Sequence, residues 1–216
     1  MLLYLAGAAR EILSYIPSNN EEGGAEVLTG DEVNRHIDAA FGDVTSLVKS
    51  FADDGKYIEL YADYAKSVSV GLISLAGVVC GVVGTNHAEN EGRLTSAAAR
   101  KAAKFVSMCD SFNIPVLTLV DCEGVACDKE SENAPLASEL AKLAFAYTTA
   151  KNSKVTVVVG KAYGAAYTLM GSKSVGADIA FALESACISI LPPEAAVAFA
   201  WNDKITADKS REELEN

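Results

Sequence analysis

Histidine and aromatic residues are scarce in this 216-residue chain, in which only 7% of the residues are aromatic and His36 and His87 are the two histidines. With so few histidines, a serine–histidine–aspartate triad has few ways to form. His36 falls in a polar stretch, so we expect it on the surface. His87 directly follows an apolar run; a catalytic role there stays open, although a structural one is favoured.

Positive charge is also in short supply, because 18 Lys and Arg face 29 Asp and Glu and the formal net charge is −11. Such a surface repels nucleic-acid phosphates and anionic lipid headgroups, so neither is an expected partner. No apolar stretch is long enough to span a membrane. The first residues lack the basic segment of a signal peptide. We therefore expect a cytoplasmic protein.

Motifs for phosphate and metal binding are missing as well. The sequence has neither a Gly-x-x-x-x-Gly-Lys-Ser/Thr loop nor a Gly-x-Gly-x-x-Gly after a strand. Its five cysteines are an odd number. Cys122 and Cys127 form the one close pair, and no second Cys/His pair follows at zinc-finger distance. We predict no metal site, and free thiols in a reducing cytoplasm.

What remains is a pattern of alternating strands and helices. A first helix should end before Pro17, and 18–30 reads as a polar linker. Short helices are expected at 31–41, capped by Asp31, and at 44–51. Runs at 66–75 and 78–84 predict a hairpin. Beyond them we expect a helix from Thr95 or Ser96 to 112, a strand at 116–120, a loop at 121–133, a helix at 134–150, a strand at 154–160, a helix at 163–170, and strands at 178–181 and 187–190. This order predicts an α/β fold with strand–helix crossovers.

Two strand ends are candidate sites, because ligands of α/β sheets collect beyond the carboxyl ends of strands. One strand runs into Asp121-Cys122-Glu123-Gly124, and the next into a helix that begins near Gly164-Ala165-Ala166. Backbone N–H groups in the first turn of a helix lack intrahelical acceptors and lie at the positive end of its dipole. They can form an oxyanion hole, in which each donor contributes about 3–4 kcal/mol. Tight packing of small residues explains the same pattern equally well.

Longer stretches resemble one known family. Residues 103–121 (AKFVSMCDSFNIPVLTLVD) resemble the ARFVRFCDAFNIPIVTLVD segment of acyl-CoA carboxylase carboxyltransferase subunits. Residues 161–167 (KAYGAAY) are similar to that family's KAYGGAY, and 170–178 (MGSKSVGAD) to its MGSKHLGAD. Residues 13–20 (LSYIPSNN) resemble the LSYLPSNN that joins the family's two halves. The resemblance covers nearly the whole chain, in order.

The resemblance implies the C-terminal, biotin-side half of a carboxyltransferase with a crotonase-like (ClpP/crotonase) β-β-α fold. Such an enzyme transfers CO2 between carboxybiotin and the α-carbon of an acyl-CoA. The resemblance also implies a helix and linker at 1–30 and a carboxyltransferase domain at 31–216 that is truncated at its C-terminal end. The backbone N–H groups of Ala165 and Ala166 would hold the ureido oxygen of biotin. We place Tyr163, Gly164, Gly124 and Asn86 in the biotin- or substrate-binding site.

Biotin on its carrier protein and a coenzyme A ester are then the cofactor and the substrate. The implied partners are an N-terminal carboxyltransferase half, a biotin carboxyl carrier protein and further copies in a dimer or larger oligomer, and the isolated chain should be inactive. Ala165 stands where the family has a second Gly, and residues 122–127 keep only Gly124 of the family's loop. These departures leave two alternatives: a stand-alone crotonase-type hydratase or isomerase, which needs a carboxylate such as Glu89, Glu91 or Glu123, and an inactive assembly domain.

Overall fold

The computed structural model describes the chain except for residues 1, 23–24, 33, 35, 38–42 and 202–216. Within the described residues, one seven-stranded sheet has the order β1-β2-β3-β4-β5-β6, and β7 pairs with the far end of β5. The pairs β1–β2 and β2–β3 are antiparallel, and the others are parallel. The strands are β1 (Ile58–Leu60), β2 (Val68–Leu75), β3 (Val78–Thr85), β4 (Val116–Cys122), β5 (Lys154–Tyr163), β6 (Ile179–Ala182) and β7 (Cys187–Ser189).

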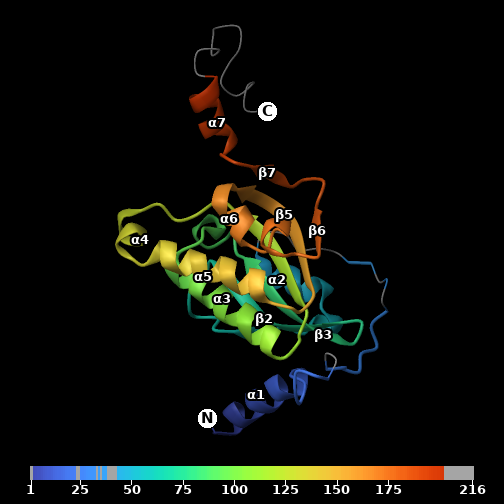
Figure 1. Ribbon diagram of the computed structural model, residues 1–216. Coiled ribbons are helices and arrows are strands. Elements are labelled where there is room, and N and C mark those ends of the chain that lie inside the picture. Colours follow the sequence, from blue (N-terminus) through green and yellow to red (C-terminus); the bar gives the residue numbers. More distant parts are fainter. Residues whose placement is uncertain (1, 23–24, 33, 35, 38–42, 202–216) are drawn as a thin grey trace.

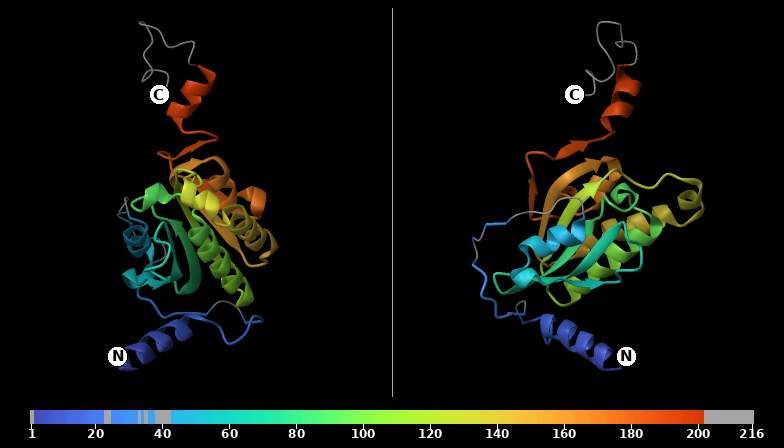
Figure 2. Two further views of the ribbon diagram at one scale, coloured as in Figure 1. Left: turned by 90° about the vertical axis from the view of Figure 1, so that its left-hand side faces the viewer. Right: turned by 180° about the vertical axis from the view of Figure 1, so that it is seen from behind.

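Helices cover both faces of the sheet, with α3 and α5 on one side and α2 on the other (Figures 1 and 2). The helix α1 lies at one end of the molecule and α7 at the opposite end (Figure 1). The helices of the described residues are α1 (Leu2–Tyr15), α2 (Val44–Phe51), α3 (Ser96–Ser111), α4 (Lys129–Asn133), α5 (Leu136–Thr149), α6 (Gly164–Leu169) and α7 (Pro193–Ala200). The predicted α/β architecture is confirmed.

Alternation along the strands divides the buried side chains between two cores. In β3, Val79 and Val83 face the larger core beneath α3 and α5, whereas Cys80 and Val82 face the smaller core beneath α2. A sheet covered on both faces needs apolar residues at every position of a strand. This requirement explains why the central strands read as continuous apolar runs.

The predicted hairpin is present, and its turn is Ala76-Gly77. Both residues have positive φ, 51° and 81°, as a tight two-residue turn between antiparallel strands requires. The Asp53 carboxylate accepts both turn N–H groups, at 3.0 Å from Ala76 and 2.8 Å from Gly77. These bonds offset the strain of a left-handed conformation at an alanine.

The prediction of a helix at 31–41 is wrong for those residues of the segment that the structure describes. Residues 31, 32, 34, 36 and 37 are not helical, and the rest of that segment lies outside the described residues. The carboxylate of Asp31, the expected cap, instead accepts the distant N–H of Asp54 at 3.0 Å. The next helix, α2, is capped as expected at its own start, because Asp43 accepts the N–H of Ser46.

Smaller differences concern the ends of elements and the predicted linker. The loop expected at 121–133 contains the short helix α4. The strand β5 extends three residues beyond its predicted end, because its last residues pair with β7. In the predicted linker, Val27 donates to the oxygen of Gly77 at 2.7 Å and Ala25 accepts from Val79 at 3.1 Å. That segment is therefore hydrogen-bonded to the start of β3 and to the turn before it.

Candidate active site

The carboxyl ends of β3, β4 and β5 lie side by side, because these three strands are parallel neighbours. Near those ends, Cys122 of β4 pairs with Ala162 of β5. The two junctions singled out in the sequence, 121–124 and 160–166, therefore meet at one edge of the sheet. The end of β3, at Thr85, joins them.

The start of α6 offers two backbone donors. Tyr163 is the N-cap residue and makes no side-chain capping bond, and Gly164 has a φ of +59°. Among the described residues, no group outside α6 accepts a hydrogen bond from the N–H of Ala165 or Ala166. Ala165 is exposed, whereas Ala166 is completely buried. A ligand oxygen approaching from solvent therefore meets the Ala165 end of this turn first.

Two other predicted site residues occupy different positions. Gly124 lies beside the start of α6, since a Cβ at that glycine would stand 3.9 Å from the oxygen of Tyr163. Asn86 follows β3, where its N–H donates to Ser67 and its buried Oδ1 has no hydrogen-bond partner in the described structure. Among the described residues, no backbone hydrogen bond joins Asn86 to α6. Tyr163, Gly164, Ala165, Ala166 and Gly124 are thus brought together, and Asn86 stands apart at the neighbouring strand end.

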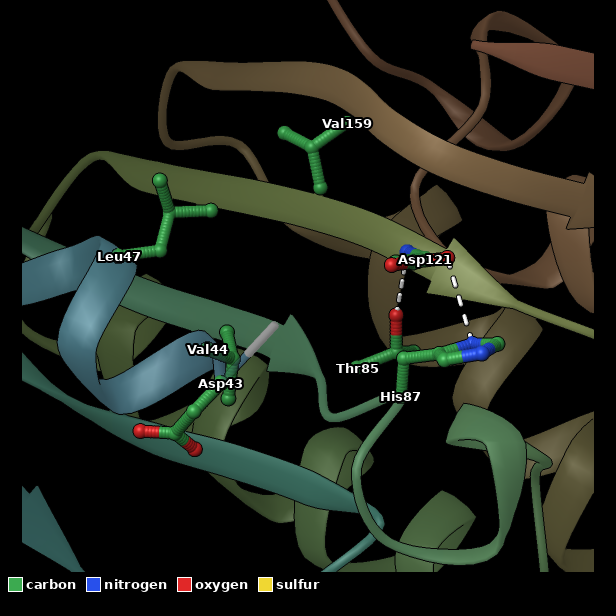
Figure 3. Close-up of a pocket in the computed structure, with 7 residues that line it drawn as sticks. All are labelled: Asp43, Val44, Leu47, Thr85, His87, Asp121 and Val159. Atoms are coloured by element: carbon green, nitrogen blue, oxygen red, sulfur yellow. Dashed lines mark hydrogen bonds and ion pairs between the residues drawn. The ribbon is translucent and has the colours of Figure 1, made fainter. Parts of the chain in front are cut away.

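Asp121 lies between these strand ends, in a small pocket lined also by Thr85 and His87 (Figure 3). Its N–H donates to Thr85 Oγ1 at 2.6 Å, and its Oδ1 stands 3.5 Å from Nδ1 of His87. The same Oδ1 accepts the N–H of Lys161 at 2.9 Å. The carboxylate therefore connects the end of β4 to the end of β5.

A chain of charges crosses the same edge of the sheet. Lys161 Nζ lies 2.5 Å from Glu123 Oε1, and Arg93 lies 3.7 Å from the other oxygen of Glu123 and 2.5 Å from Glu91. The hydrogen bond from Lys161 lowers the pKa of Glu123 below its usual range, and the same bond raises the pKa of Lys161. Both groups are therefore charged at neutral pH.

Nearby titratable groups are kept neutral by burial. Burial, followed by the adjacent Cys187 thiol, raises the pKa of Tyr163 to about 12. Burial likewise raises the pKa of Cys122 to about 11. Neither group can act as an ionised nucleophile or base near pH 7. The backbone N–H groups of α6 are donors at this edge that need no titrating side chain.

The sequence named several residues of this edge but not the contacts between them. His87, the open candidate, lies beside Asp121, whereas His36 is exposed, as expected. The pairing of Lys161 with Glu123 spans 38 positions and follows from the adjacency of β4 and β5. The signal that could have found it is the placement of each charged residue at or just beyond a strand end.

The cysteines are free, as predicted, with Cys127 and Cys187 exposed and the other three buried. Among the residues that the structure describes, no group of three or more His, Cys, Asp and Glu side chains is placed to hold a metal ion. None of the described helices is both long and apolar enough to cross a membrane.

Comparison with known proteins gives consistent matches along the chain. Residues 6–216 match the model of the carboxyl transferase domain. The chain is 34% identical over 219 residues to the carboxyltransferase subunit of propionyl-CoA carboxylase from Haloferax mediterranei, covering 95% of this chain and 42% of that protein. It is also 34% identical to the methylmalonyl-CoA carboxyltransferase 12S subunit of Propionibacterium freudenreichii subsp. shermanii, covering 92% and 40%.

Solved structures agree with these matches. A crystal structure of transcarboxylase 12S with hydrolysed methylmalonyl-coenzyme A bound superposes with a TM-score of 0.89 at 32% identity, covering 96% of this chain and 42% of that one. That structure is described as a hexamer assembly. The chain thus spans about two fifths of the length of the curated relatives it matches, and it corresponds to their C-terminal half.

Proposed function

Because the chain belongs to the carboxyl transferase domain family and has its crotonase-like fold, we propose that it is the biotin-side half of a biotin-dependent acyl-CoA carboxyltransferase. The reaction moves CO2 between carboxybiotin and the α-carbon of an acyl-CoA. The observation that carries this proposal is the pair of uncommitted N–H groups at the start of α6, inside the segment that matches the family.

The residues at the start of α6 suit a biotin ureido group. The ring supplies an N1 atom that carries CO2, and its carbonyl oxygen gains negative charge when N1 gives up the carboxyl group. The N–H groups of Ala165 and Ala166 can donate to that oxygen, and the helix dipole adds partial positive charge. Ala165 carries a methyl group close to the donors, so the biotin oxygen has less room to approach these N–H groups than it would at a glycine.

The charges at the neighbouring strand ends weigh against a stand-alone hydratase or isomerase. That chemistry needs a carboxyl group that is free to exchange a proton with substrate. Glu123 is held by Lys161 at 2.5 Å, and Glu91 by Arg93 at 2.5 Å. The lowered pKa of Glu123 makes it a weak base. Donors from the backbone, which need no titrating side chain, fit carboxyl transfer better.

An exposed apolar surface supports the proposed partners. Large hydrophobic side chains stand in solvent along β6, β7 and α7, where Ile190 is 85% and Phe199 86% exposed. The other members of this surface are Ile179, Phe181, Leu183, Ile188, Leu191 and Trp201. Exposed apolar side chains that gather on neighbouring elements often mark protein interfaces. We propose that an N-terminal carboxyltransferase half covers it, in a dimer or larger oligomer that also receives a biotin carboxyl carrier protein.

The free thiols favour a cytoplasmic location.

Removing one backbone donor tests this function directly. Ala165→Pro deletes the exposed N–H at a position in the first turn, where a helix tolerates proline. Loss of one oxyanion-hole donor lowers kcat by about 100- to 1000-fold. The measurement is carboxyl transfer by the chain combined with its N-terminal half, the biotin carrier and an acyl-CoA.

Ala165→Gly is the matched control, because it keeps the N–H and removes only the methyl group. We expect this variant to retain the activity of the unaltered enzyme or to exceed it. Absence of carboxyl transfer by the complete unaltered assembly would refute the proposed function. Equal activity of the proline and glycine variants would refute the role of this N–H.

A further inference from the structure

Near the end of β5, where the strand pairs with β4 and β7, one carboxylate also accepts a backbone N–H. Asp121 Oδ1 accepts the backbone N–H of Lys161 at 2.9 Å, across 40 positions of the sequence. The backbone of Asp121 is itself fixed, because its N–H donates to Thr85 Oγ1 at 2.6 Å, and His87 Nδ1 lies 3.5 Å from its Oδ1. Figure 3 shows Asp121 at the end of its strand, with both of these side chains on one side of it. The ends of β3, β4 and β5 are therefore joined through one residue.

The contact between Asp121 and β5 is close-fitting. A Cβ at Gly160 would lie 2.4–2.6 Å from all three atoms of the Asp121 carboxyl group, far inside van der Waals contact. Position 160 therefore has to be glycine for the carboxylate to reach the N–H of Lys161. The Asp121 carboxylate is thus a specific acceptor, and the absence of a side chain at Gly160 leaves room for it.

Besides the backbone pairing of β4 with β5, a second side-chain interaction joins these strand ends, and it is weaker. Lys161 Nζ reaches Glu123 from a side chain that is 46% exposed. Exposed ion pairs of this kind contribute little, because water screens the charges and the long lysine side chain loses entropy. The half-buried Asp121 instead accepts a hydrogen bond from the backbone of β5 itself, at the first of the three residues that also pair with β7.

We propose that Asp121 is a positioning residue for carboxyl transfer. By fixing the backbone at Lys161, it sets the place and direction in which α6 begins, and hence where the N–H groups of Ala165 and Ala166 point. This inference rests on the proposed function, since it concerns the same donors. Asp121 acts through the backbone between Lys161 and Ala165 and not by contact with biotin or substrate.

The opposite end of β5 provides a matched control. There Asp178 Oδ2 accepts the backbone N–H of Lys154 at 2.7 Å, which is the same kind of bond on the same strand. Asp178 lies at the amino end of β5, away from α6. Replacing either aspartate removes one carboxylate–backbone bond. Only the loss of Asp121 should disturb the start of α6.

The first experiment compares Asp121→Ala, Asp121→Asn and Asp178→Ala in the complete carboxyltransferase assembly. A misplacement of about 1 Å at reacting groups costs about 100-fold in rate, so we expect Asp121→Ala to lower kcat by about 10- to 100-fold with little change in KM for the biotin carrier. Asp121→Asn keeps an oxygen acceptor and should recover most of kcat. Asp178→Ala should leave kcat within about twofold, even where it lowers Tm equally.

A double-mutant cycle tests the fit at Gly160. Gly160→Ala alone should lower kcat in the same way, because its methyl group displaces the carboxylate. In the Asp121→Ala background the same methyl group meets no carboxylate, so the second substitution should cost little more. If the two losses simply multiply, or if Asp121→Asn is as inactive as Asp121→Ala, the positioning role is wrong.

Amide hydrogen exchange separates this proposal from the proposed function. In the 216-residue chain, Asp121→Ala should speed exchange at the N–H of Lys161 and change it at residues 164–166, and Asp178→Ala should not. An inactive unaltered assembly refutes the function, whereas unchanged exchange at Lys161 in Asp121→Ala refutes the positioning. If Asp121→Ala does not fold, Asp121→Asn and Gly160→Ala carry both readouts.

Discussion

Substituting Gly171 with alanine should destabilise the chain through two separable effects. Gly171 directly follows Met170, the C-cap residue of α6, and has a φ of +66°. An L side chain in this left-handed conformation costs about 1–2 kcal/mol. The new Cβ would also stand 3.0 Å from Thr156 Oγ1 and from Tyr147 Cε1, and 3.1 Å from Thr118 Oγ1.

These three neighbours cannot move away easily. Tyr147 is fully buried and its hydroxyl bonds Thr118 at 2.9 Å, while Thr156 donates to the oxygen of Gly171 itself. Overpacking a closed core costs about 1–3 kcal/mol. The two effects together predict that Gly171→Ala lowers the free energy of unfolding by about 2–5 kcal/mol.

Gly55→Ala isolates the backbone contribution. Gly55 has nearly the same φ, +63°, but the nearest atom to its Cβ position is the oxygen of Lys49 at 3.7 Å, an ordinary contact. We expect a loss of about 1–2 kcal/mol there. The reduced entropy of the unfolded chain is common to both variants and cancels in the comparison.

Urea unfolding of the two variants beside the unaltered chain measures the difference. The crowding predicts that Gly171→Ala is less stable than Gly55→Ala by about 1–3 kcal/mol. Equal losses would show that the core around Tyr147 and Thr118 accommodates a methyl group. The description of that core as closely packed would then be wrong.

Two further outcomes follow from the titratable groups. At pH 8 a thiol reagent should label two cysteines in the native chain, Cys127 and Cys187, and five after denaturation, because the others are buried; labelling of Cys122, whose pKa is raised to about 11, would contradict this. Glu123→Gln should destabilise the chain by about 0.2–1 kcal/mol at neutral pH. Since the folded pKa of Glu123 is lowered, this stabilisation is present above the ordinary glutamate pKa of about 4.3 and disappears as the pH falls through the folded value. Thermal unfolding of both chains at pH 7 and in acid measures it, and a difference that persists in acid would refute the ion-pair explanation.

Local sequence patterns determined much of the fold. The hairpin at Ala76-Gly77, the end of α1 before Pro17 and the strand–helix order after Pro115 all depend on neighbours a few residues apart, and all are present. The same is true of α6, whose small residues follow a long apolar strand. Resemblance to a family supplied the proposed role of that helix start, because the residues alone left tight packing as an equal alternative.

Tertiary structure decided the contacts between distant segments. Asp31 became an acceptor for Asp54 in place of a helix cap, and the pairing with β7 extended β5. Asp121 met Lys161 only because parallel pairing of β4 and β5 brings both carboxyl ends to one edge of the sheet. A periodic pattern specifies which face of a strand is buried, but it does not specify which strands are neighbours. The proposed donors at the start of α6 could therefore be read from the sequence, and the carboxylate proposed to position them could not.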